Sequence, residues 1–312
     1  MSKKHFFCFG LGYTGTALCE LLLKEGWSVS GTCRTKIEQS ALNSLGFNTC
    51  LFDGASSETK LLESLASASH LLSTVPPGES GDPILPFLEK HLKNTGGFSW
   101  VGYLSTTGVY GHRDGSWVNE DSETNPQSVR GLKRLAAEQA WTNLSKQYSL
   151  PLHIFRLSAI YGPGRNSLLR VLDGKARRID RPGLFFSRIH LTDLIQVIRA
   201  SIEASNPGRI YNVGDDLPTP PEEVIRFACE LLNIEPPPLV PLEKCEMSDL
   251  AKSFYQDSKR VSNSRIKKEL GVHLIYPDFK SGLTALFKNL NANRRSFPRQ
   301  GGKKVPDKGS GN

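Results

Sequence analysis

The sequence predicts an α/β protein built on a doubly wound parallel sheet with a small C-terminal lobe. Two observations support this fold class. From residue 5 to about residue 160, short apolar runs alternate with amphipathic segments of helical length, the pattern of strand–helix–strand units. A G-x-G-x-x-G motif follows the first apolar run and opens the first helix. Right-handed crossovers between such units wind helices onto both faces of the sheet.

The predicted elements follow in order. The first strand is Phe6–Phe9, and the helix over Thr16–Lys24 ends at Gly26. A later helix begins near Gln127, between the fifth and sixth strands. Strands two to six are expected at residues 27–32, 47–52, 70–75, 100–105 and 152–157.

The glycine motif indicates a dinucleotide-binding loop of the Rossmann type. The first glycine permits the tight turn, the second lets a pyrophosphate approach the backbone, and the third lets helix and strand pack closely. At the end of strand two, Arg34 stands where a carboxylate would select NAD, and its guanidinium suits a 2′-phosphate, so NADP(H) is favoured over NAD. Asp53, after strand three, either reaches the adenine or caps a helix. The predicted cofactor residues are Gly10, Gly12, Tyr13, Thr14, Gly15, Arg34 and Asp53.

The strand–helix alternation ends after Gly164. A strand-like run is expected at 184–186, helices at 193–202 and 220–232, and a last sheet strand at 209–213. Asp193 is expected to cap the first of these helices. These features predict a dinucleotide-binding domain over residues 1–164, a small substrate lobe over 165–292 and a disordered basic tail over 293–312.

The composition favours a soluble, cytoplasmic protein. Hydrophobic residues make up 38% and charged residues 22% of the 312 residues. No apolar run approaches the roughly 18 residues that span a bilayer. The 6 cysteines include no C-x-x-C pair, so a reduced setting is expected. Much of the net charge of +8 comes from the tail, and no aromatic residues interleave with basic ones, which argues against a nucleic-acid partner.

Several segments together resemble one known family. The chain resembles an atypical extended short-chain dehydrogenase/reductase of the NAD-dependent epimerase/dehydratase superfamily, of the YeeZ-type subgroup, from Lys3 to about Asn291. The segments that carry the resemblance are residues 10–15, 104–111, 130–139, 156–165, 187–193 and 210–216.

The resemblance implies three candidate catalytic residues, two of them altered. Thr106 matches the Ser or Thr that binds a substrate oxygen, three residues before Val-Tyr-Gly. Arg130 and Arg134 occupy the Tyr and Lys positions of the family's Tyr-x-x-x-Lys motif. Arg134 is able to donate to the nicotinamide ribose, whereas Arg130 cannot exchange a proton near neutral pH but is able to bind an anionic substrate. The alternative is that both arginines lie on a solvated helix face.

Two further departures concern the substrate. By the same resemblance, Ala159 and Phe186 stand where sugar-nucleotide enzymes carry an Asn and an Arg, so the sequence does not predict the usual grip on a nucleotide sugar. An active enzyme would need a substitute proton donor, and His112, Thr107 or a bound water are the candidates. A single histidine on a loop, however, more often has no part in catalysis. No set of metal ligands stands out.

Two hypotheses remain from the sequence. The first is an NADP(H)-dependent oxidoreductase or epimerase-like enzyme with a rearranged acid–base apparatus and an unknown small-molecule substrate. The second is a catalytically inactive dinucleotide-binding module that acts as a sensor or protein partner.

Overall fold

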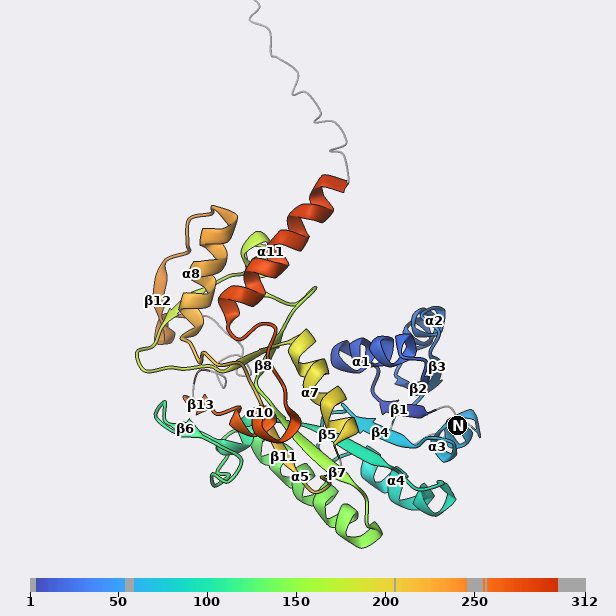
Figure 1. The fold of residues 1–312 in the computed structure, drawn as a ribbon. Helices are drawn as coiled ribbons and strands as arrows, with labels where there is room; N and C mark the ends of the chain where they lie inside the picture. The colour runs from blue at the N-terminus through green and yellow to red at the C-terminus, as the bar shows by residue number, and fades with distance from the viewer. Residues whose placement is uncertain (1–3, 54–58, 205, 246–254, 256, 297–312) are drawn as a thin grey trace, which may run out of the picture.

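Seven parallel strands form the central sheet of the computed structural model, which describes residues 4–53, 59–204, 206–245, 255 and 257–296. Their order across the sheet is β11-β7-β5-β4-β1-β2-β3 (Figure 1). This order confirms the predicted doubly wound fold, because it reverses between β1 and β4. The strands are β1 (His5–Phe9), β2 (Ser28–Cys33), β3 (Asn48–Leu51), β4 (His70–Ser73), β5 (Trp100–Thr106), β7 (Leu152–Leu157) and β11 (Ile210–Val213).

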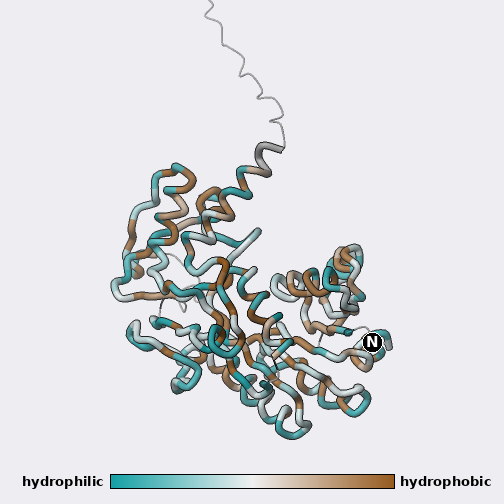
Figure 2. The backbone as a smooth tube through the Cα atoms, viewed as in Figure 1, coloured by the Kyte–Doolittle hydropathy of each residue, from teal (hydrophilic) through white to brown (hydrophobic). Residues whose placement is uncertain are grey.

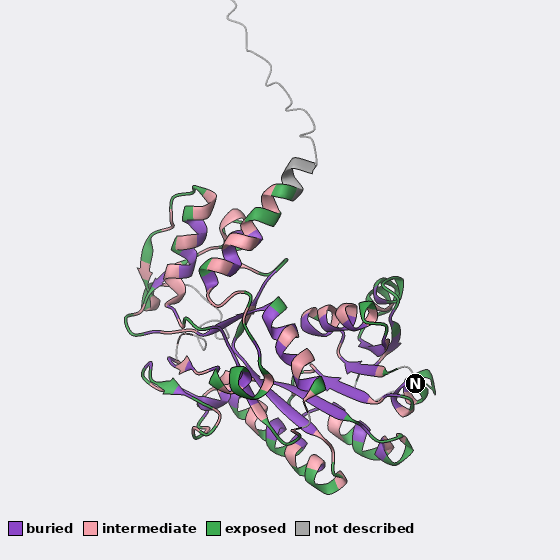
Figure 3. Cartoon of the chain, viewed as in Figure 1, coloured by how far each residue is buried: buried purple, intermediate pink, exposed green. Residues whose placement is uncertain are grey.

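Helices cover both faces of the sheet. Leu18, Leu194 and Ile266 belong to one apolar cluster, and Leu61, Leu88 and Trp141 belong to a second. Figure 3 colours the strands of the sheet as buried, and Figure 2 shows hydrophilic and hydrophobic residues alternating along the helices. The first layer contains α1 (Tyr13–Lys24), α2 (Lys36–Ser44), α7 (Leu191–Glu203) and α10 (Ser264–Leu270). The second contains α3 (Thr59–Ala66), α4 (Ile84–His91) with the short helix η1 (Leu92–Asn94), and α5 (Val129–Tyr148).

A third apolar cluster lies outside the sheet. Leu168, Val224 and Phe279 bring together α6 (Ser167–Leu172), α8 (Pro221–Leu232) and α11 (Phe279–Ser296). Figure 1 shows α8 and α11 standing away from the sheet. Three small parallel sheets complete the described structure: β8 (Ala159–Tyr161) with β10 (Arg188–His190), β9 (Arg178–Asp180) with β12 (Leu239–Pro241), and β6 (Trp117–Val118) with β13 (Arg260–Val261). The short helix η3 spans Leu242–Lys244.

The C-terminal third differs from the sequence prediction in three places. The run at 184–186 is not a strand: Phe186 forms a single bridge with Thr219, and β10 begins only at Arg188. The predicted Asp193 cap is wrong, because His190 is the N-cap of α7. Helix α11 continues to Ser296, past the expected boundary at residue 293, and residues 297–312 of the predicted tail lie outside the described residues. The division into domains stays a prediction.

Candidate functional site

The glycine motif forms the turn between β1 and α1. Gly10 has φ +86°, and a Cβ there would fall 2.7 Å from the Thr74 hydroxyl oxygen. A Cβ at Gly15 would fall 2.7 Å from the Gly10 carbonyl oxygen. A Cβ at Gly12 would meet nothing within 4 Å. Gly12 is also the N-cap of α1, with no side-chain cap and no acidic residue in the first turn. The turn therefore presents uncapped backbone N–H groups to open space, the arrangement that binds a phosphate.

The two residues between the glycines point in different directions. Thr14 is buried beneath the turn. The Tyr13 hydroxyl donates to the Pro163 carbonyl at 2.9 Å, and the Arg165 guanidinium lies 5.9 Å from the centre of the Tyr13 ring. Tyr13 therefore joins the glycine turn to the loop that follows β8.

The end of β2 carries the exposed Arg34 and a carboxylate, Glu38, that is engaged locally. The Glu38 carboxylate accepts the backbone N–H groups of Arg34 and Thr35, at 3.1 and 3.0 Å, as part of the capping box of α2. These bonds lower the pKa of Glu38, so this carboxylate is ionised and already engaged. The side chain of Arg34 is exposed, and Asp53 lies exposed beyond β3, the neighbour of β2. Glu38 is the carboxylate nearest to Arg34 along the described chain, and it is thus engaged in capping α2.

The carboxyl end of β5 presents Thr106. Its hydroxyl oxygen accepts the Gly108 N–H at 3.1 Å and caps the short helix η2 (Thr107–Tyr110). A hydroxyl donates as well as accepts, and in the described structure the Thr106 proton has no acceptor assigned. Thr106 is half-buried, so it can donate to a substrate oxygen at this edge.

Arg134 turns from α5 toward the same edge. Its guanidinium donates to the Leu104 carbonyl at 2.8 Å and to the Tyr103 hydroxyl at 3.1 Å, and its buried Nε has no hydrogen-bond partner. Lys133 instead pairs with the exposed Glu79. Arg134 is therefore not part of a solvated face, whereas its contact with a cofactor ribose stays a prediction.

Arg130 lies one helical turn before Arg134 on α5. Its side chain is exposed at the surface, yet its pKa lies below the ordinary value for arginine. Desolvation is the largest cause, followed by the positive charges of Arg134 and Arg165. A long arginine side chain buries its stem while its charged head stays in water, so Arg130 is both exposed and partly desolvated. The three arginines therefore share one electrostatic neighbourhood.

A buried polar network that the sequence did not predict lies beneath this edge. The Glu138 carboxylate accepts N–H groups of Arg156, the shortest at 2.8 Å, and accepts the Ser105 hydroxyl at 2.5 Å. Arg156 also donates to the Tyr110 hydroxyl at 2.9 Å, which donates to the Asn212 side chain at 2.7 Å. The network therefore ties α5, β5, β7, η2 and β11 together directly behind Thr106.

The histidines near the site are engaged elsewhere. His112 accepts the Ser258 N–H at Nδ1, and its Nε2 lies 2.8 Å from the Asp114 carboxylate. His190 accepts the Thr192 N–H, and burial lowers its pKa to about 4. Asp193 accepts the N–H groups of Ile275 and Tyr276 rather than capping α7.

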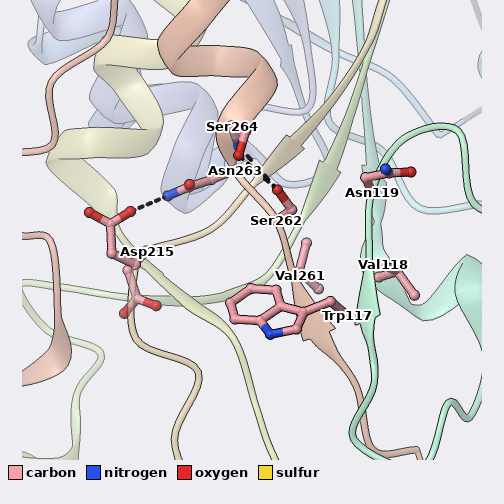
Figure 4. Close-up of a pocket in the computed structure, with 9 residues that line it drawn as sticks. Trp117, Val118, Asn119, Asp215, Val261, Ser262, Asn263 and Ser264 are labelled. Carbon is pink, nitrogen blue, oxygen red and sulfur yellow. Dashed lines mark hydrogen bonds between the residues drawn. The ribbon is translucent and has the colours of Figure 1, made fainter.

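A separate pocket of about 450 Å³ lies at the far end of the sheet, after β11 (Figure 4). Its lining includes Trp117, Asn263 and Asp215, whose carboxyl group is buried and has a pKa raised by desolvation to about 8. Residues of β6, β13 and the segment after β11 line this pocket, and residues of the glycine turn do not. Elsewhere in the described chain, no group of three or more His, Cys, Asp or Glu is placed to hold a metal ion, and no helix is long and apolar enough to cross a membrane.

Comparison with known proteins finds a sequence match over the part of the chain that carries these residues. The sequence model of the NAD-dependent epimerase/dehydratase family matches residues 90–214, which include Thr106, Arg130, Arg134 and the buried network. Over this stretch the chain is similar to members of this family. Members of the family are NAD(P)-dependent epimerases and dehydratases. The YeeZ-type subgroup stays a prediction.

Three known proteins show what the chain is similar to. A conserved protein of unknown function from Silicibacter pomeroyi is 42% identical with a TM-score of 0.84, over 92% of this chain and 99% of that protein. UDP-glucuronic acid 4-epimerase from Bacillus cereus, solved with NAD, is 18% identical with a TM-score of 0.74, over 92% of this chain and 99% of that one. Human dTDP-D-glucose 4,6-dehydratase is 28% identical over 142 residues, or 42% of this chain and 39% of that protein. The match thus spans about two-fifths of the curated relative.

Proposed function

We propose that this protein binds NADP(H) and acts as an atypical oxidoreductase or epimerase-like enzyme on a small substrate. The glycine turn carries the proposal. Its uncapped N–H groups and the open space at Gly12 fit a dinucleotide pyrophosphate, whereas side chains at Gly10 and Gly15 would collide with neighbouring atoms. When bound, the dinucleotide would supply the hydride chemistry of the family.

The preference for NADP(H) over NAD rests on the end of β2. Arg34 is exposed there, and the carboxylate of Glu38 is held by two backbone N–H groups, so it is not available to a ribose 2′-hydroxyl. An arginine donates two parallel hydrogen bonds to a phosphate. The relatives solved with NAD are too distant in sequence to decide this choice.

The proposed roles of the other residues follow from their contacts. Thr106 would donate its hydroxyl proton to a substrate oxygen, and Arg134, held by the Leu104 carbonyl, would donate to the nicotinamide ribose. Arg130 would bind and not exchange protons. Both nitrogens of His112 are occupied and Thr107 donates to the Leu157 carbonyl, so a water at Thr106 is the proton source that we propose.

The second candidate is a dinucleotide-binding module without catalysis, and the presence of Arg130 at the family's Tyr position favours it. One experiment separates the two. NADPH and NADH are titrated by fluorescence into the purified protein, and NADPH oxidation is then followed against a panel of carbonyl compounds and sugar nucleotides. Turnover supports the enzyme, whereas binding without turnover across the panel supports the module.

The same titration tests the cofactor preference. NADPH should bind at least about tenfold more tightly than NADH, equivalent to roughly 1.4 kcal/mol. The Arg34→Asp variant should narrow or reverse this gap. Lys60→Asp, the same charge change at an exposed position on α3, should leave it unchanged. Equal affinities in the unmutated protein would remove Arg34 from the site.

A further inference from the structure

The lobe turn, defined as residues 162–165 after β8, is fixed by its own sequence. Gly-Pro-Gly-Arg suits a type II turn, which favours proline at its second position and needs a positive φ at its third. Gly164 has φ +72°, the Arg165 N–H donates to the Gly162 carbonyl at 3.1 Å, and the Gly162 N–H donates to the Arg165 carbonyl at 2.8 Å. The Asn166 side chain donates to the Gly162 carbonyl at 2.9 Å and also caps α6. The fold therefore sets the position from which the Arg165 side chain extends.

The lobe turn packs against the glycine turn at Tyr13, the first residue of α1. A Cβ at Gly162 would fall 2.8 Å from the Tyr13 hydroxyl oxygen, so the absence of a side chain there lets the two turns approach this closely. The Tyr13 hydroxyl donates to the Pro163 carbonyl at 2.9 Å. The Arg165 guanidinium lies 5.9 Å from the centre of the Tyr13 ring, within the range of a cation–π contact. Two segments far apart in the sequence thus meet through direct contacts of one side chain.

The burial of these residues shows on which side of the glycine turn they meet. Thr14 and Gly15 are buried beneath the turn, whereas Gly12 is exposed and Tyr13 is half-buried. Arg165 is exposed as well. A pyrophosphate bound by the N–H groups at the start of α1 would lie on this open side, where Gly12 leaves space. The Arg165 cation therefore borders the place where the two phosphate charges would bind.

Other arginines of the lobe make contacts within the lobe. Arg178 donates to the Glu222 carboxylate at 3.0 Å, and Arg188 donates to the Thr219 carbonyl at 3.0 Å. Arg165 extends instead from the lobe turn over the first residue of α1. Its place is therefore set by the glycine turn as well as by the lobe.

We infer that Arg165 binds the pyrophosphate of the dinucleotide from the side opposite the glycine turn. The inference rests on the proposed function and adds a cofactor-binding residue to it. A guanidinium donates paired, charge-assisted hydrogen bonds to phosphate oxygens, whereas the N–H groups of the glycine turn are neutral donors. NADPH and NADH share the pyrophosphate, so Arg165 contributes equally to the affinity for both. Arg34, by contrast, contributes to the affinity for NADPH alone.

The test compares the two nucleotides on the full-length chain. NADPH and NADH are titrated by fluorescence into the unmutated protein and into Arg165→Gln and Arg165→Lys. The matched control is Arg226→Gln, the same change at an exposed arginine of α8, which Figure 1 shows standing away from the sheet. The melting temperature of each protein is measured without nucleotide.

We expect Arg165→Gln to weaken the binding of NADPH and of NADH about tenfold each, so that the ratio of the two affinities stays constant. Arg165→Lys, which keeps the charge but loses the planar pair of donors, should lose less affinity for both. Arg226→Gln should bind both nucleotides like the unmutated protein. All melting temperatures should agree, because the exposed guanidinium is not needed for the turn to form.

Three results would overturn the inference while the proposed function stands. Unchanged affinities in Arg165→Gln would make Arg165 a surface charge. A loss confined to NADPH would place Arg165 at the 2′-phosphate. Equal losses of affinity in Arg165→Gln and Arg165→Lys, each with a lower melting temperature, would show that the side chain holds the turn and not the ligand. Failure of the unmutated protein to bind either nucleotide would instead contradict the proposed function, and the inference with it.

Discussion

The buried pair of Glu138 and Arg156 allows a quantitative test of what holds the sheet edge. The exposed fractions of their side chains are 5% and 6%, and the Glu138 carboxylate accepts from Arg156 and from Ser105. Replacing Glu138 by Leu leaves a buried guanidinium whose remaining described side-chain acceptor is the Tyr110 hydroxyl. Breaking a buried pair in this way costs about 3–5 kcal/mol of unfolding free energy.

Urea unfolding followed by tryptophan fluorescence and circular dichroism measures that loss. Glu203→Leu is the matched control, because Glu203 pairs with Arg199 while 53% exposed and should cost at most about 1 kcal/mol. The double variant Glu138→Leu/Arg156→Met removes both charges and should regain most of the lost stability. A loss below about 1 kcal/mol for Glu138→Leu, or a double variant as unstable as the sum of its parts, would refute the reasoning.

Three further outcomes are expected. Gly12→Ala should keep the melting temperature but weaken NADPH binding by more than about tenfold. Gly15→Ala should lower the melting temperature, because its Cβ would meet the Gly10 carbonyl oxygen. Equal melting temperatures for the two variants would contradict this. Because the pKa of His190 is lowered in the folded protein, the unfolded chain binds the proton at a higher pH than the folded one does. The unfolding free energy should therefore fall as the pH drops from 6.5 toward about 4. His190→Asn, which keeps an N-cap acceptor, should lose less stability than the unmutated protein over that pH range in urea titrations. The Arg130→Tyr/Arg134→Lys variant restores the family motif, and turnover gained only by that variant on the substrate panel would identify a lapsed enzyme, while turnover by the unmutated chain would exclude one.

The sequence predicted the sheet well because each strand is a short apolar run buried on both faces. The run at 184–186 is apolar like the strands, but its side chains make other contacts. The Arg260 guanidinium lies 3.8 Å from the centre of the Phe185 ring, and Phe186 packs near Tyr255. An apolar run indicates that its side chains pack against other residues, and at 184–186 these contacts are with side chains of the lobe and do not require strand pairing.

Contacts between distant segments were beyond sequence reasoning. Trp117 pairs with Arg260 in a sheet of two-residue strands, too short for any periodicity to register. Glu138 and Arg156 were visible as separate family landmarks, but a charged residue in a helix and another in a strand give no sign of their pairing. Arg165 lies over Tyr13, whereas Arg178 pairs with Glu222, and the sequence gives no sign of either contact.

The hydrogen bond from Tyr13 to the Pro163 carbonyl has a thermodynamic consequence. It makes the loop that carries Arg165 and the turn that carries Gly12 a single mechanical unit, so a ligand that orders one reduces the entropic cost of ordering the other. Linkage then requires reciprocity: whatever factor NADPH adds to the affinity for a ligand that contacts this loop, that ligand must add to the affinity for NADPH. Removal of one hydroxyl, as in Tyr13→Phe, should therefore weaken the coupling between the loop and the turn.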